Sequence, residues 1–145
     1  MEKINKLKNI FKKEKINGYI IPKNDEFFGE YIPDHKDRLK YISNFSGSFG
    51  FALILISSNY LFVDGRYTLQ ANKQSRNFFK IKTIPKYLPE NILKNEKLRI
   101  GFDPKLFTKR MLNIFFGKTN CDFIPLKENL IDKIWIRKNS KVKNK

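Results

Sequence analysis

Side chains that bind metals or form cross-links are scarce in this sequence. It contains one cysteine, Cys121, and one histidine, His35. A single thiol cannot form an internal disulfide, and one residue of each kind cannot build a Cys- or His-based metal cluster. We therefore expect Cys121 to be a partly buried free thiol, and His35 to be an ordinary surface histidine.

Long apolar runs are also missing. No run approaches the roughly 18–20 residues that span a bilayer. The first six residues are mostly charged or polar and contain no apolar signal core. These features predict a cytoplasmic protein with no membrane partner. The 145 residues, 41% of them hydrophobic and including 14 Phe, suit one domain with a single core.

Acidic residues are few. The chain has 14 Asp and Glu against 30 Lys and Arg, a formal net charge of +16. Such an excess favours a polyanion partner. A second interpretation is compositional, because 24 of the basic residues are Lys, and Lys, Asn and Ile all use A/T-rich codons. Since the lysines are scattered and arginines are few, we expect at most weak, salt-sensitive binding of nucleic acid.

What is present is a regular alternation of apolar segments. Residues 51–56 form a continuous apolar run, typical of a strand covered on both faces. The short connection at 57–59 predicts an antiparallel hairpin with residues 60–63. Helices are expected at 2–15, 35–43, 65–76, 89–95, 103–117 and 129–135, and strands at 18–22, 51–56, 60–63, 78–84, 98–102 and 121–125. The predicted fold class is α/β, with a mixed sheet of five to six strands flanked by helices.

Helix starts and the domain limits can also be predicted. Four positions suit helix caps: Asp34, Asp64, Asp103 followed by Pro104, and Asn129. Residues 1–136 are expected to form the domain. Residues 137–145 are almost all polar and like-charged, and we expect them to be a disordered basic tail.

Residues 31–70 contain the most specific pattern. It consists of Tyr31-Ile-Pro, then Arg38-Leu39-x-Tyr41-Ile-Ser-x-Phe45-x-Gly47-Ser48-x-Gly50, and finally Leu61-Phe-Val-Asp64-Gly65-Arg66-Tyr67-Thr-Leu-Gln70. This segment resembles the N-terminal, creatinase/prolidase-type domain of Xaa-Pro aminopeptidases, the aminopeptidase P family. Similar stretches at 18–33, 100–104 and 128–135 extend the resemblance over nearly the whole chain.

The resemblance implies a ribonuclease-H-like sheet and a parent metallopeptidase that removes the N-terminal residue preceding proline. In that family two Asp, one His and two Glu of a C-terminal domain bind two divalent metals, usually manganese, which activate a water molecule. This chain has no matching ligand set. We expect a non-catalytic domain, inactive alone and without a metal of its own, that serves domain packing, dimerisation and shaping of the substrate cleft. Its expected partners are a catalytic domain in trans or a second copy, with peptide substrate bound only in a complete enzyme.

Asp64, Arg66 and Tyr67 are the substrate-binding candidates that the resemblance implies. Asp64 also suits a helix cap, and Tyr67 a half-buried position, so both have structural explanations. In the resembling enzymes the arginine faces the active site, and a guanidinium can hold a peptide carbonyl or carboxylate in its planar fork. A purely structural ion pair of Arg66 is the alternative.

Three weaker features complete the list of candidates. The loop Phe45-Ser-Gly47-Ser48-Phe-Gly50 resembles a phosphate loop, but it lacks the Gly-Lys-Ser/Thr ending and precedes a strand, so we interpret its glycines as permitting a tight turn or close backbone approach. Asp25, Glu26 and Glu30 could act as paired carboxylates, although a solvated loop is the simpler interpretation. A stand-alone protein-binding module would expose an apolar patch at Leu130, Ile131, Ile134 and Trp135.

Overall fold

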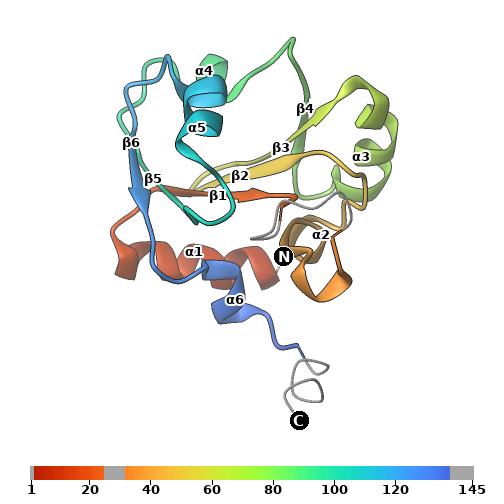
Figure 1. The fold of residues 1–145 in the computed structure, drawn as a ribbon, viewed down its shortest axis with the longest axis horizontal. Coiled ribbons are helices and arrows are strands. Elements are labelled where there is room, and N and C mark those ends of the chain that lie inside the picture. The colour runs from red at the N-terminus through yellow and green to blue at the C-terminus, as the bar shows by residue number, and fades with distance from the viewer. Residues whose placement is uncertain (1, 25–31, 138–145) are drawn as a thin grey trace.

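The computed structural model describes residues 2–24 and 32–137 (Figure 1). In this part of the chain six strands form one sheet in the order β4-β3-β2-β1-β5-β6. The strands are Gly18–Pro22 (β1), Phe51–Leu55 (β2), Asn59–Asp64 (β3), Lys80–Ile84 (β4), Arg99–Phe102 (β5) and Asp122–Pro125 (β6). The helices are Glu2–Glu14 (α1), Arg38–Ser43 (α2), Thr68–Ser75 (α3), Pro89–Ile92 (α4), Lys109–Phe116 (α5) and Leu130–Ile134 (α6), with 3-10 turns at Asp34–Lys36 (η1) and Gly65–Tyr67 (η2).

The sheet is mixed because one strand opposes the rest. β2 is antiparallel to both of its neighbours, β1 and β3. The pairs β3–β4, β1–β5 and β5–β6 are parallel. The predicted hairpin and the predicted mixed α/β sheet are therefore confirmed. Five strands run in one direction, so their carboxyl ends lie together along one side of the sheet and their amino ends along the opposite side. We call these two rows of strand ends the carboxyl edge and the amino edge; the terms do not refer to the outermost strands β4 and β6.

The alternation of side chains along the strands divides the core into two layers. Tyr19 and Ile21 of β1 point to one face, where they pack with α1, α2 and α6, whereas Ile20 points to the other. α4 and α5 lie over that second face (Figure 1). All five residues of β2 are buried, as expected for a strand covered on both faces. None of the helices in the described residues has the length and apolar content needed to cross a membrane.

Two of the predicted helix starts were wrong. Asp34 is the first residue of the 3-10 turn η1 and does not cap α2. The cap of α2 is Asp37, which accepts a hydrogen bond from the Lys40 amide at 3.1 Å. Asp103 likewise begins a turn, and α5 starts later, at the cap Thr108. The caps at Asp64 and Asn129 are confirmed, because each side chain accepts a hydrogen bond from the amide two residues on.

Candidate functional site

The predicted substrate-binding residues lie at the carboxyl edge, where β3 ends. This is the edge at which α/β sheets commonly bind ligands. Asp64 Oδ1 accepts a hydrogen bond from the Arg66 amide at 2.9 Å, which fixes the turn η2. The Arg66 guanidinium then folds back, and its Nη2 lies 2.9 Å from Asp64 Oδ2. Asp64 thus holds both the backbone and the side chain of Arg66.

The ion pair leaves Arg66 accessible. The Arg66 side chain is 75% exposed, against 28% for Asp64. The hydrogen bond from Arg66 lowers the pKa of Asp64, and the same hydrogen bond raises the pKa of Arg66. Both groups are therefore charged at neutral pH. The structural ion pair that the sequence left as an alternative is present, but it positions an open cation and does not bury it.

Tyr67 connects this turn to the glycine-containing loop. Its hydroxyl and that of Ser48 form a short hydrogen bond. Its ring meets Phe45 edge-on, with centroids 6.2 Å apart and planes at 80°. The Arg66 guanidinium lies 5.2 Å from the Tyr67 ring centroid. Tyr67 thus supports both the loop and the arginine.

An apolar groove adjoins Arg66, and sequence reasoning did not find it. We call it the Arg66 groove; it has a volume of about 470 Å³. Its wall includes Ile114 of α5, which is 54% exposed. The only sign of this groove in the sequence was Ile114, an apolar residue on the outward side of α5. The lining residues are Phe49, Asp64, Arg66, Ile84, Pro85, Leu88, Ile114 and Phe115.

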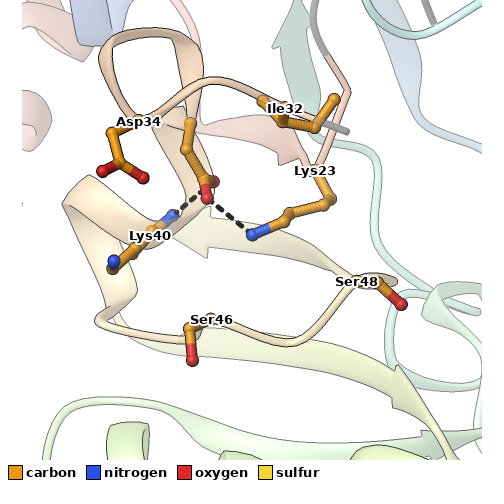
Figure 2. Close-up of a pocket in the computed structure, with 7 residues that line it drawn as sticks. Lys23, Ile32, Asp34, Lys40, Ser46 and Ser48 are labelled. Carbon is orange, nitrogen blue, oxygen red and sulfur yellow. Dashed lines mark hydrogen bonds and ion pairs between the residues drawn. The ribbon is translucent and has the colours of Figure 1, made fainter. Parts of the chain in front are cut away.

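A second, polar hollow of about 210 Å³ lies beside the glycine-containing loop 45–50, which contributes Ser46 and Ser48 to it (Figure 2). Lys23 and Asp37, which line it, form a direct ion pair with Nζ and Oδ2 2.6 Å apart and side chains only 12% and 6% exposed. Ser46, from the glycine-containing loop, bonds elsewhere: its amide donates to Gln74, and its hydroxyl accepts from Gln70 and Gln74. The polar groups of Ser46 are thus bonded to Gln70 and Gln74, which agrees with a structural role for this loop.

The glycines of that loop are needed for close packing. A Cβ on Gly50 would lie 3.0 Å from the Phe62 carbonyl oxygen and 3.1 Å from the Phe45 ring. Gly47 is similarly enclosed by the Phe45 and Tyr67 rings. Neither backbone has a positive φ. The close-approach interpretation is therefore confirmed, and no left-handed turn is involved.

The metal-ligating residue types do not converge in the described residues. No group of three His, Cys, Asp or Glu side chains comes together in residues 2–24 and 32–137. The thiol of Cys121, which is partly buried, points to the Glu96 carbonyl at 3.6 Å. Asp25, Glu26 and Glu30 lie outside the described residues. The metal-ligating residues therefore do not assemble, within the described part of the chain, the two-metal ligand set that the resemblance implies for the parent enzymes.

The C-terminal segment packs onto the domain, which corrects one expectation. Leu130 and Ile131 are 1% and 0% exposed, so they belong to the core and do not form an apolar surface patch. Trp135 is partly buried and stacks on Tyr41 with centroids 4.6 Å apart. Ile134 packs against the same core.

A charged cluster holds this segment in place. Asp132 accepts hydrogen bonds from Arg38 Nε at 2.9 Å and from Arg137 Nη2 at 2.7 Å. Arg137, which the sequence placed in the tail, also donates to the His35 carbonyl at 2.6 Å. Burial raises the pKa of Asp132, but the hydrogen bonds from the two arginines outweigh it, so the pKa is lowered. Residues 138–145 lie outside the described residues.

Fold and site together define a mixed α/β domain with an arginine-bearing carboxyl edge and no assembled metal-ligand set in its described part. The sequence model of the creatinase/prolidase N-terminal domain matches residues 3–134. The chain therefore belongs to the creatinase/prolidase N-terminal domain family, as the resemblance at residues 31–70 indicated.

Similar proteins agree with this assignment. The chain is 34% identical over 146 residues to Xaa-Pro aminopeptidase 1 of Dictyostelium discoideum, covering 92% of this chain and 23% of that protein. It is 31% identical over 140 residues to the probable Xaa-Pro aminopeptidase P of Coprinopsis cinerea, covering 89% and 22%. The chain thus spans less than a quarter of the length of these curated relatives.

Solved structures show the same fold. X-prolyl aminopeptidase from Caenorhabditis elegans, described as a cytosolic enzyme with a di-nuclear active site, superposes with a TM-score of 0.81 at 27% identity, covering 92% of this chain and 25% of that one. The N-terminal domain of the cytoplasmic peptidase PepQ from Mycobacterium tuberculosis superposes with a TM-score of 0.71 at 20% identity. The match covers 98% of that second structure, so nearly the whole of that N-terminal domain has this fold.

Proposed function

We propose that this chain acts as the non-catalytic N-terminal domain of an Xaa-Pro aminopeptidase and presents Arg66 to the peptide cleft. The observation that carries the proposal is the held but exposed guanidinium at the carboxyl edge. Asp64 fixes its direction, and 75% of the side chain remains open to a partner. A guanidinium held in this way can bind a peptide carbonyl or carboxylate with little further loss of conformational freedom.

The Arg66 groove gives the neighbouring catalytic domain a place to pack. Its exposed Ile114, together with Ile84 and Pro85, forms an apolar wall next to the arginine. Covering this wall would bring a second domain to Arg66 and remove water from around the guanidinium, which strengthens its hydrogen bonds. The two metals would be held by that domain, since no group of three metal-ligating side chains converges among the described residues of this chain. We also propose a cytosolic location for this chain, the location given for the similar X-prolyl aminopeptidase of Caenorhabditis elegans.

A chimeric enzyme tests the proposal. This chain replaces the matching N-terminal segment of the Dictyostelium discoideum enzyme, and kcat/KM is measured for Xaa-Pro peptides. The expected result is an active chimera in which Arg66→Ala lowers kcat/KM about 10- to 100-fold, the range for one lost charge-assisted hydrogen bond, and Arg66→Lys loses less. Arg76→Ala, which removes another exposed arginine at the end of α3, is the matched control and should change nothing.

Two outcomes count against the proposal. Equal activity of the Arg66→Ala and Arg76→Ala chimeras would remove Arg66 from the cleft. A chimera that folds but shows no activity would mean that this domain does not pair with such a catalytic domain. Because Arg66 is exposed, the free energy of unfolding of the isolated chain should be the same with and without the substitution.

A further inference from the structure

The amino edge of the sheet, opposite the Arg66 groove, carries a second groove with a different character. We call it the basic groove; its volume is about 510 Å³. It lies between α1 and the turn that follows β2, and Asn17, which precedes β1, forms part of it. Four of its lining residues are basic, Lys8, Lys12, Lys15 and Arg99, and three are apolar, Phe11, Ile16 and Ile56.

Two of the four cations of the basic groove are held by backbone carbonyl groups. Lys8 Nζ donates to the Ile56 carbonyl at 3.1 Å, which joins α1 to the end of β2. Arg99 Nε donates to the Lys15 carbonyl at 2.8 Å. These bonds use carbonyl oxygens, which carry no formal charge, so both groups keep their net positive charge. Lys12 and Lys15, which line the same groove, are exposed.

No carboxylate lines the basic groove among the described residues. The acidic side chain nearest in sequence, Glu14, is directed to Lys133 of α6, with Oε2 and Nζ 3.5 Å apart. Asp122 lies opposite Arg99 in the β5–β6 register but is not part of the groove. Four cations therefore act together on whatever enters.

The apolar residues decide which kind of anion fits. Ile56 is 59% exposed at the wall of the groove, so its apolar side chain is open to a ligand among the cations. Phe11 is only 1% exposed, so its ring face cannot stack on a base. Three of the four cations are lysines, whose compact point charges can each bind one carboxylate. The groove is thus complementary to carboxylates that flank an apolar side chain.

We propose that the basic groove is a docking site for an acidic peptide segment of a partner protein, in which Asp or Glu residues flank a Leu, Ile or Phe. The carboxylates bind Lys12, Lys15 and Arg99, and the apolar side chain packs on Ile56. The site lies at the amino edge, so its occupation leaves the Arg66 groove open. It is therefore independent of the proposed role of Arg66.

The probe is a fluorescein-labelled synthetic peptide in which Glu alternates with Leu and Phe, titrated with the whole chain and followed by fluorescence anisotropy. We expect saturable binding that weakens as salt rises to physiological strength. Lys12→Gln/Lys15→Gln should weaken binding about tenfold, as expected when exposed ion pairs are lost together, and Ile56→Asn should weaken it as well. The matched control is Lys105→Gln/Lys109→Gln, which removes the same charge at two other exposed positions and should bind as the unsubstituted chain does.

Three results would overturn the proposal. The first is equal binding of a peptide with every Leu and Phe replaced by Ser, which would leave charge alone as the cause. The second is equal weakening by the control pair, which would mean that the net charge and not the groove attracts the peptide. The third is tighter binding of a single-stranded DNA of equal charge. That arm matters because an adjoining hollow carries Arg76, Lys80 and the half-exposed ring of Phe78.

Discussion

Two glycines near the Arg66 groove have opposite surroundings. A Cβ on Gly50 would press on the Phe62 carbonyl oxygen at 3.0 Å, and backbone cannot move aside as a flexible side chain can. A Cβ on Gly65 would have no neighbour within 4 Å. The same substitution should therefore have different effects at positions only fifteen residues apart in the sequence.

Gly50→Ala should lower the free energy of unfolding by about 1–3 kcal/mol, the usual cost of forcing an extra carbon into a packed site. Gly65→Ala should leave it unchanged or raise it by up to about 1 kcal/mol, because alanine restricts the unfolded chain. Urea denaturation of the two variants measures both values. Equal stabilities would contradict the close approach of β3 to Gly50.

Asp132 is the residue on which the C-terminal charged cluster depends. Asp132→Asn would remove the Arg38–Asp132 ion pair, in which the Arg38 side chain is only 10% exposed. We expect a loss of about 1–3 kcal/mol in the free energy of unfolding at neutral pH. Asp122→Asn, at an exposed position on β6, is the control and should have no such effect.

The effect of Asp132 should depend on pH. Its pKa is lowered in the fold, so the native state holds the proton less tightly than the unfolded chain does. The stabilisation is therefore complete at pH values above the ordinary Asp pKa of about 4, and it is lost as the pH falls through the lowered value. Urea titrations should show the wild-type chain and Asp132→Asn approaching each other in acid. A stability difference that stays constant down to the lowest pH would refute the ion pairing.

At the scale of elements, the start of α5 shows why a strong local signal can be misleading. The Asp-Pro pair at 103–104 favours a helix start, and Asp103 does accept a hydrogen bond from the Lys105 amide at 2.9 Å. Its other oxygen, however, accepts from the Asn129 side chain at 2.9 Å, a residue 26 positions away. That long-range contact buries Asp103 and holds it in a turn, and α5 begins only at Lys109, after its cap Thr108.

Thr108→Ala should therefore destabilise the domain by about 1 kcal/mol, since the Thr108 hydroxyl accepts a hydrogen bond from the Met111 amide at 3.2 Å. Thr108→Ser keeps the hydroxyl and should stay close to the wild-type value. Thermal unfolding followed by circular dichroism compares the three chains. If the alanine and serine variants unfold together, the cap is not at Thr108.

Elements with strong periodicity could be predicted, whereas contacts between distant residues could not. The apolar run at 51–56 and the helical spacing at 2–15 gave β2 and α1 because their signals are local. The Arg66 groove brings together Phe49, Ile84 and Ile114, and the Arg38–Asp132 pair joins residues 94 positions apart. No spacing rule reports such contacts. The position of Arg66 itself was accessible only through resemblance to a family.

At the scale of the whole molecule, the two edges of the sheet have separate tasks in our account. The carboxyl edge presents Arg66 beside an apolar wall, and the amino edge presents four cations around Ile56. Of the basic residues behind the net charge of +16, those at the amino edge are therefore the ones expected to bind an anionic partner. We expect charge-driven binding to follow the amino edge and peptide hydrolysis to require a second, metal-bearing domain at the carboxyl edge.

The most direct test is an assay of the purified chain with an Xaa-Pro peptide and Mn²⁺. The account predicts that the N-terminal residue is released no faster than in buffer, because the described residues assemble no metal-ligand set. Turnover at about 1 s⁻¹ or faster, a rate ordinary for an enzyme, and its loss on chelating the metal, would contradict the assignment of this chain as a non-catalytic domain.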